Sequence, residues 1–82
     1  MNEDSIKEQV RQIVLSVNRL DGSVSADVEL NKLGFDSLDV STIFAEIENV
    51  FGIEVEIEIA MGLKTINEIA GHLTERLSIE QT

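Results

Sequence analysis

One serine in this sequence stands where local chemistry favours a phosphate ester. The segment from Leu33 to Asp39 reads LGFDSLD, and an amphipathic helical pattern follows directly. If Asp36 caps that helix, Ser37 is its first residue, and its hydroxyl lies beside backbone N–H groups without a partner in the helix. These groups and the positive end of the helix dipole favour a phosphodiester anion. From the local segment alone, however, a plain polar first-turn residue is the commoner explanation of Ser37.

The helix expected to begin at Ser37 has an apolar residue on its outer face. At about 100° per residue, Leu38 lies roughly 160° from Val40, a member of the apolar stripe. Small or neutral residues surround Leu38 on this face, and carboxylates flank them. Such a surface suits repeated, transient, salt-sensitive docking of basic partners. The residues predicted to contact partners are Asp36, Leu38, Asp39, Ser41, Thr42, Ala45 and Glu48.

The remaining reactive residue types argue against catalysis and against metal binding. The segment around Ser37 lacks the second glycine of a hydrolase nucleophile elbow, and the one histidine, His72, is expected to face solvent. Asp36 and Asp39 do not fit a calcium-binding loop, which requires a glycine and a terminal glutamate. Because the chain has no cysteine, any thiol chemistry must come from a cofactor. We therefore expect a non-catalytic protein without a metal site.

Length and charge narrow the class of protein further. The 82 residues suffice for a single domain over residues 1–82, with a small core of Ile, Leu and Val. The net charge of −10 argues against binding of nucleic acid or anionic lipid through a basic face, and favours basic partners. The N-terminal MNEDSIKE does not resemble a signal peptide, and no apolar run is long enough to cross a bilayer. The expectation is a cytoplasmic monomer that does not insert into membranes.

Three amphipathic patterns predict the main helices that must position Ser37. They cover residues of about 5–19, 37–51 and 65–77. Capping boxes are expected at Ser5 with Glu8 and at Thr65 with Glu68, and Gly52 is expected to end the middle helix. The apolar face of the middle helix is predicted to comprise Val40, Ile43, Phe44, Ile47, Val50 and Phe51.

The first two helices are joined by a long connection. Asp21-Gly22 predicts a turn, and four apolar residues without sustained periodicity follow it before Phe35. Loops of this length are usually functional or disordered, and the apolar residues indicate that this one is fixed to the core. These residues are Val24, Val28, Leu30 and Leu33.

The segment from Ile53 to Ile59 alternates apolar and acidic residues, which is typical of a half-buried strand. A lone strand would have no partner in an otherwise helical chain unless a second molecule paired with its edge. We therefore predict an extended lead-in followed by a short helix over about residues 57–62.

Together, LGFDSLD, the ENVFG that ends the middle helix, and the order of the helices resemble the acyl carrier protein family from about residue 6 to 77. The resemblance implies an all-α four-helix bundle with three main helices, one short helix and a long first loop. It also implies that a phosphopantetheinyl transferase attaches 4′-phosphopantetheine from coenzyme A to Ser37, and that acyl groups ride on this arm as thioesters. Asp36, Leu38 and Asp39 match the family's recognition segment. The implied partners are acyl-transferring and acyl-modifying enzymes with basic docking surfaces.

The sequence departs from many fatty-acid carriers at a few positions. Thr42 stands where an acid is common, Asn49 and Val50 replace part of an acidic run, and Glu56 occupies a position that is frequently proline. The outer helix face is therefore less acidic than in a typical fatty-acid carrier. Fatty acid biosynthesis, polyketide biosynthesis and related lipid metabolism all stay open, and a specialised carrier is as well supported as a housekeeping one.

Two further hypotheses concern the cargo and the rival function. We hypothesise that the small aliphatic core opens to shelter part of an acyl chain. The alternative to a carrier is an unmodified acidic interaction module, which would dimerise through residues 53–59. The core residues named for sheltering the chain are Val14, Ile43, Phe44, Ile47, Ile69 and Leu73.

Overall fold

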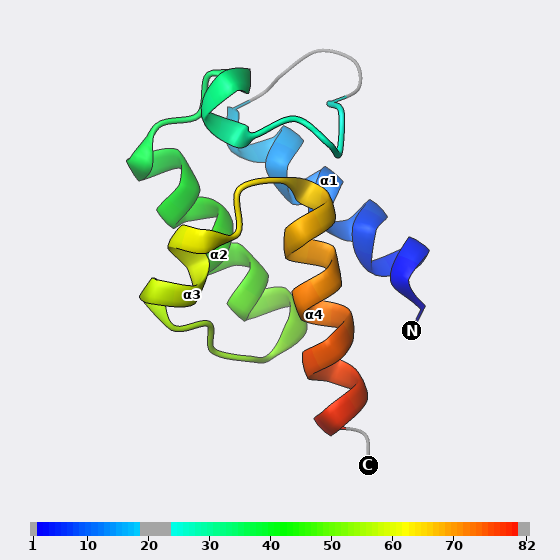
Figure 1. Ribbon diagram of the computed structural model, residues 1–82. Helices are drawn as coiled ribbons and strands as arrows, with labels where there is room; N and C mark the ends of the chain where they lie inside the picture. Colours follow the sequence, from blue (N-terminus) through cyan, green and yellow to red (C-terminus); the bar gives the residue numbers. More distant parts are fainter. Residues whose placement is uncertain (1, 19–23, 81–82) are drawn as a thin grey trace.

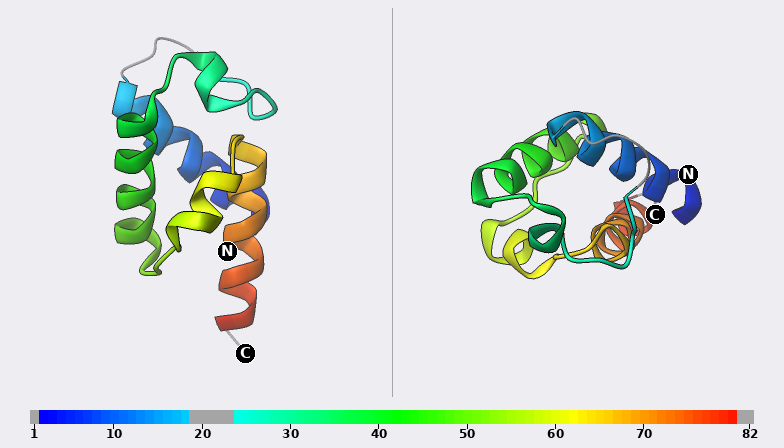
Figure 2. Two further views of the ribbon diagram at one scale, coloured as in Figure 1. Left: turned by 60° about the vertical axis from the view of Figure 1, so that its left-hand side comes forward. Right: turned by 90° about the horizontal axis from the view of Figure 1, so that it is seen from above.

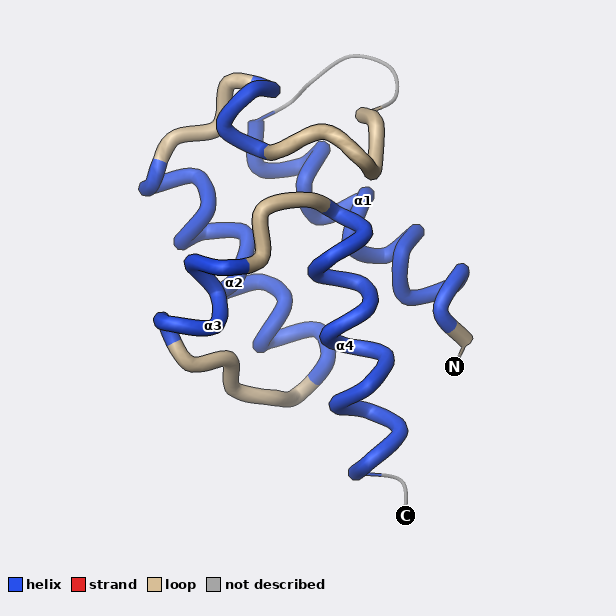
Figure 3. Tube along the Cα trace, viewed as in Figure 1, coloured by secondary structure: helices blue, strands red, loops and turns tan. Residues whose placement is uncertain are grey.

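The computed structural model describes residues 2–18 and 24–80, and every regular element in these ranges is a helix (Figures 1 and 3). This arrangement confirms the expected all-α bundle of four α-helices. Seen from above, the four helices surround a common interior (Figure 2). In chain order the elements are α1 (Glu3–Asn18), a short 3₁₀ helix (Leu30–Leu33), α2 (Ser37–Phe51), α3 (Ile57–Gly62) and α4 (Ile66–Glu80).

Helix α1 begins two residues earlier than the sequence pattern predicts. Asn2 supplies the cap, because its Oδ1 accepts a hydrogen bond from the Ser5 N–H at 2.8 Å. The predicted capping box of Ser5 with Glu8 is therefore wrong. Glu8 instead accepts hydrogen bonds from Gln12 and from Arg11, and these lower the pKa of its carboxyl. The predicted helix end at Arg19 and the Asp21-Gly22 turn lie outside the described residues.

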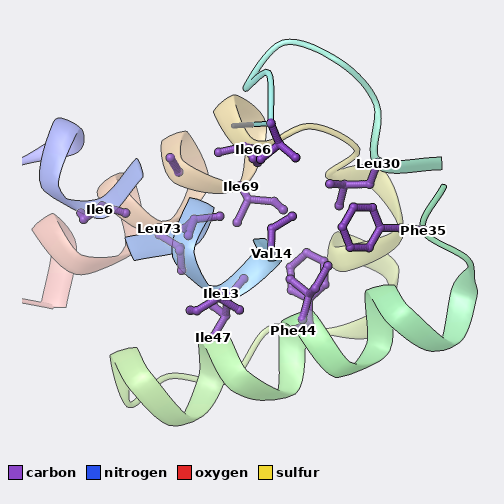
Figure 4. Packing of buried hydrophobic residues seen from close by; sticks show 14 of the residues in the cluster. Ile6, Ile13, Val14, Leu30, Phe35, Phe44, Ile47, Ile66, Ile69 and Leu73 are labelled. Atoms are coloured by element: carbon purple, nitrogen blue, oxygen red, sulfur yellow. The ribbon is translucent and has the colours of Figure 1, made fainter. Parts of the chain in front are cut away.

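The core lies where α1 packs against α4 and α2. Figure 4 shows the side chains of Val14, Phe44 and Ile69, from three different helices, pointing toward one another. The eight largest fully buried side chains of the described residues are all aliphatic, as the composition predicts. They are Ile6, Val10, Val14, Ile43, Ile47, Ile66, Ile69 and Leu73.

The predicted apolar face of α2 is wrong at one position. Val50 is 50% exposed, whereas Ile43, Phe44 and Ile47 are buried as expected. Gly52 ends the helix in a left-handed conformation, with φ of 67°, and the chain then turns so that Ile53 enters the core. Because Ile53 takes the inward position at this end of α2, Val50 is left facing solvent.

The long connection is fixed to the bundle both by apolar side chains and by its backbone. Val24 and Leu30 are buried, and Val28 and Leu33 are half-buried. The Leu30 N–H donates to the Lys64 carbonyl at 2.8 Å, and the Ala26 carbonyl accepts from the Asn67 N–H at 3.0 Å. The connection is therefore hydrogen-bonded to the residues at the start of α4. The 3₁₀ helix within it was not predicted, because four residues are too few to show a helical period.

The segment after α2 agrees with the predicted extended lead-in and short helix. Ile53 is buried and Val55 is half-buried, but Ile57, the next apolar residue in the alternation, is 72% exposed. From Ile57 onward the apolar residues of the alternating pattern are no longer the buried ones, because the backbone becomes helical at α3. No residue of α3 is buried.

Helix α4 begins with the capping box predicted for it. The Thr65 Oγ1 accepts from the Glu68 N–H at 3.1 Å, and the Glu68 Oε1 accepts from the Thr65 N–H at 3.1 Å. The helix continues to Glu80, three residues beyond the predicted end. One expectation for this helix is wrong: His72 is half-buried, and its Nε2 is buried without a hydrogen-bond partner among the described residues. His72 is enclosed because it lies beside Leu73 on the helix that packs along α1.

Removing this cap is expected to lower the stability of the whole bundle. Thr65→Ala should reduce the free energy of unfolding by about 1 kcal/mol, because the Glu68 N–H loses its acceptor. Urea denaturation followed by circular dichroism measures the change. Thr65→Ser keeps the hydroxyl oxygen and is the matched control, expected to retain most of the stability. Equal losses in both variants would show that the Thr65 methyl group, and not the cap, matters.

Candidate functional site

The start of α2 is held by two reciprocal hydrogen bonds between carboxylates and backbone. The Asp36 Oδ1 accepts from the Asp39 N–H at 2.9 Å, and the Asp39 Oδ2 accepts from the Asp36 N–H at 3.2 Å. Asp36 is thus the helix cap, as predicted, and Asp39 takes the place that glutamate usually has in a capping box. These contacts fix the backbone on both sides of Ser37 without using its side chain.

Immediately before the cap, the chain makes a turn that requires glycine. Gly34 has φ of 98°, and its N–H donates to the carbonyls at the start of the 3₁₀ helix. A residue with a Cβ would be strained in this left-handed conformation. The turn allows the Phe35 side chain to enter the core while the next two residues, Asp36 and Ser37, stay at the surface. Ser37 is therefore exposed although its neighbours anchor it.

Ser37 is the first residue of α2, with an exposed side chain. By helix geometry, the N–H groups of Ser37 and Leu38 have no carbonyl of the same helix to which they can donate. A phosphate ester on the Ser37 oxygen would lie at the positive end of the helix dipole, close to these donors. The residues present therefore fit a covalently attached phosphodiester.

A cavity of about 620 Å³ adjoins Ser37. Its walls come from α2, from α3 and from the connections on either side of α2, and most of the residues are apolar. Glu48 stands in the wall, and its Oε2 accepts from the Val55 N–H at 2.8 Å, which ties α2 to the chain leading into α3. The lining residues are Asn31, Phe35, Asp36, Ser37, Val40, Ser41, Phe44, Ala45, Glu48, Val55, Ile57, Ala60 and Met61.

The residues predicted to contact partners divide into two groups. Leu38 is 76% exposed, as its position on the helix predicts, and four further residues on or before α2 are also exposed. Asp39 and Glu48 are half-buried, and each has a carboxylate engaged within the chain. The exposed group therefore comprises Asp36, Leu38, Ser41, Thr42 and Ala45.

Sequence reasoning missed two apolar residues on α3. Ile57 is 72% exposed and Met61 is 73% exposed, and both line the cavity beside Ser37. Their spacing of four residues, which places side chains on one helix face, was the available signal. It was obscured because the alternation of residues 53–59 indicates a strand.

The charges around the site are almost all negative. No Lys or Arg occurs in the sequence between Lys32 and Lys64, a stretch that includes α2 and α3. Among the side chains described, in residues 2–17 and 24–77, no three His, Asp or Glu are grouped so that they could hold a metal ion. None of the helices in the described part of the chain is long and apolar enough to span a membrane.

A family model described as "Phosphopantetheine attachment site" matches residues 8–73. The chain is 29% identical over 73 residues to an acyl carrier protein of Streptococcus pyogenes serotype M3, covering 88% of this chain and 96% of that protein. It is 45% identical over 47 residues to acyl carrier protein 1, chloroplastic, of Spinacia oleracea, covering 57% of this chain but 34% of that protein.

Two solved structures have a similar fold. BlmI, described as a type-II acyl carrier protein of Streptomyces verticillus involved in bleomycin biosynthesis, superposes with a TM-score of 0.83 at 19% identity, covering 92% of this chain and 89% of that chain. A putative acyl carrier protein of Mycobacterium tuberculosis has a TM-score of 0.75 at 27% identity, covering 80% of this chain and 90% of that chain.

Proposed function

Because the chain belongs to the acyl carrier protein family, we propose that it carries acyl groups as thioesters on a 4′-phosphopantetheine arm attached to Ser37. The observation that carries the assignment of Ser37 is its position as the exposed first residue of α2, directly behind the Asp36–Asp39 cap. The phosphopantetheine attachment model covers this position. The arm supplies the thiol that the cysteine-free chain lacks.

Attachment requires the Ser37 hydroxyl to act as a nucleophile toward coenzyme A in the active site of a phosphopantetheinyl transferase. The Ser37 oxygen forms a bond to the phosphorus that bears pantetheine, and the pyrophosphate P–O bond breaks. Adenosine 3′,5′-bisphosphate leaves, and the hydroxyl proton passes to a base of the transferase. The chain's own contribution is to hold Ser37 exposed beside the first-turn N–H groups of α2, which stabilise the resulting phosphodiester.

The chain itself is a non-catalytic carrier in this proposal. It forms a single domain over residues 1–82, acts as a monomer in the cytoplasm, and presents its cargo to acyl-transferring and acyl-modifying enzymes. A flexible arm raises the effective concentration of the cargo at a docked enzyme, so that weak docking suffices. The streptococcal relative, aligned over nearly its whole length, supports the carrier function, and a housekeeping role stays open. The uncharged Thr42 and Asn49 support a specialised pathway, and we retain both roles.

The attachment is tested by incubating the protein with coenzyme A and a broad-specificity phosphopantetheinyl transferase. We expect the intact mass to rise by one phosphopantetheine, and proteolytic peptides to place the group on Ser37. Modification of Ser16, Ser25 or Ser41 instead would contradict the assignment. A chain that gains no mass with any transferase tried would contradict the carrier function itself.

The cavity beside Ser37 supports a different place for the cargo from the one the sequence suggests. Of the six core residues named for sheltering an acyl chain, only Phe44 lines this cavity. We therefore propose that the acyl chain enters between α2 and α3, where a mainly apolar space already exists, and that the core stays closed.

Nuclear magnetic resonance of octanoyl-loaded protein tests this placement. Nuclear Overhauser contacts are expected between chain methylenes and the side chains of Phe44, Val55 and Ala60, all of which line the cavity. Acetyl-loaded protein, which has no methylenes to bury, is the control. Contacts only to Ile69 or Leu73 would place the chain in the core, and a chain without protein contacts would show that it stays in solvent.

A further inference from the structure

We propose that the phosphopantetheinyl transferase docks on α3, with the exposed apolar side chains of Ile57 and Met61 at the centre of the contact. This inference rests on the proposed function, since it concerns the enzyme that must reach Ser37. It differs from the expectation drawn from the sequence, in which basic partners dock on the outer face of α2 through charge.

Helix α3 is the most apolar exposed element of the described chain. Among the side chains that the structure describes, in residues 2–17 and 24–77, five large apolar ones are exposed, and Ile57, Ile59 and Met61 of this six-residue helix are three of them. Ile57 and Met61, four residues apart, lie on one helix face. Clustered apolar residues at the surface usually mark an interaction site, whereas single ones do not.

These two side chains share a cavity with the residue that must be modified. Ile57, Met61 and Ser37 all line the same cavity between α2 and α3. A protein surface that covers Ile57 and Met61 therefore covers part of the wall of the cavity that Ser37 also lines. Val50 and Ile59, which are also exposed, do not line the cavity.

The backbone leading into α3 is held in place, so α3 presents a defined surface. The Val55 N–H donates to the Glu48 carboxylate at 2.8 Å, and the Arg76 guanidinium donates to the Glu54 carbonyl at 3.1 Å. These contacts fix the chain to both α2 and α4. They do not cover Ile57 or Met61, which stay about three-quarters exposed.

The charges around Ile57 and Met61 favour a basic protein over a second copy of this chain as the binding partner. Glu56 and Glu58 flank Ile57 and are exposed, and no base occurs in the sequence from residue 33 to 63. A second copy of the chain would bring the same carboxylates together, and each copy already has a net charge of −10. A transferase with an apolar patch bordered by Lys or Arg would complement both the apolar centre and the acidic flanks.

Transferase kinetics with substituted carriers test the proposal. Ile57→Ser with Met61→Ser is expected to raise the KM for the carrier about tenfold, because a loss of 1.4 kcal/mol is a tenfold change. The kcat should stay within about twofold, since Ser37 and its cap are untouched. For wild-type carrier, raising the salt from ~50 to ~200 mM should change the KM far less than the double substitution does, because apolar contact is not screened.

Matched controls separate α3 from other apolar surface. Val50→Ser removes an exposed apolar residue from α2, and Ile59→Ser removes one from α3 outside the cavity. Both should leave the KM within about twofold. Circular dichroism melting of all variants establishes that each is folded, which is expected because the substituted side chains are not buried.

Several results would overturn the inference. An unchanged KM in the double variant, or an equal rise in the Val50→Ser control, would remove α3 as the docking element. A larger effect from Glu56→Gln with Glu58→Gln would show that charge dominates. If light scattering showed that the wild type is a dimer and that the double variant is a monomer, the surface would bind a second copy of the chain and not the transferase. In each of these cases wild type still gains phosphopantetheine at Ser37, so the proposed function would survive.

Discussion

Ser37→Ala is expected to abolish the gain of phosphopantetheine completely, while wild type is converted to the modified form under the same conditions. The substitution removes the only atom that forms the new bond to phosphorus, and alanine offers no replacement nucleophile. Intact-mass spectrometry after incubation with coenzyme A and transferase measures the outcome. Because the cap of α2 uses the carboxylates of Asp36 and Asp39 and not the serine hydroxyl, the variant should fold normally.

The matched control for this experiment is Ser41→Ala. Ser41 lies one turn further along α2, is exposed, and lines the same cavity, but it is outside the first turn of the helix. The Ser41→Ala variant should still gain one phosphopantetheine, at Ser37. If Ser37→Ala were still modified and Ser41→Ala were not, the attachment point would move to Ser41.

Ile69→Ala is expected to cause the largest loss of stability among the substitutions considered. Ile69 is completely buried on α4, and its side chain points toward those of α1 and α2 (Figure 4). Removing a fully buried isoleucine side chain costs about 2–5 kcal/mol, through lost transfer free energy and the cavity left behind. A small domain has a free energy of unfolding of only about 5–15 kcal/mol, so the variant should be partly unfolded at modest urea concentration.

Urea titration followed by circular dichroism at 222 nm measures this loss, since a chain without Trp and Tyr gives little fluorescence signal. Ile57→Ala is the control, because it removes the same atoms from a side chain that is 72% exposed. Its free energy of unfolding should change by less than about 0.5 kcal/mol. Equal losses in the two variants would mean that burial in the α1–α2–α4 core does not determine stability.

The features that sequence predicts well are those specified by neighbouring residues. The predicted range of α2 matches the structure because Asp36 and Gly52 mark its two ends. The predicted range of α3 matches as well, because a strand over this acidic-apolar segment would have had no partner strand in a helical chain. The capping box of Thr65 with Glu68 sets the start of α4 in the same way. The place of Ser37 as the first residue of α2 follows from the same local signals, whereas its role as an attachment point comes from the resemblance to the family and stays a prediction.

The features that sequence does not predict depend on contacts between distant segments. Asn2 and Ser5 can both cap α1, and the sequence does not show which one the fold uses. Val50 lies on the expected core face, but the turn at Gly52 places Ile53 there instead. The burial of His72 depends on the packing of α4 along α1. The cavity forms between helices that are separate in the sequence, so no local pattern reveals it.

One consequence follows from the lack of any buried residue in α3. The most deeply buried side chains belong to α1, α2 and α4, so moving α3 outward exposes little apolar surface and requires little of the total folding free energy. The α3 side of the cavity is therefore less strongly fixed to the core than the α2 side, which carries Ser37, and it is held mainly through the hydrogen bonds of the chain that leads into it. With the cargo placed in this cavity, as proposed, acyl groups of different lengths displace α3 without unfolding the bundle, so the free energy of unfolding of the loaded carrier should vary little with cargo length.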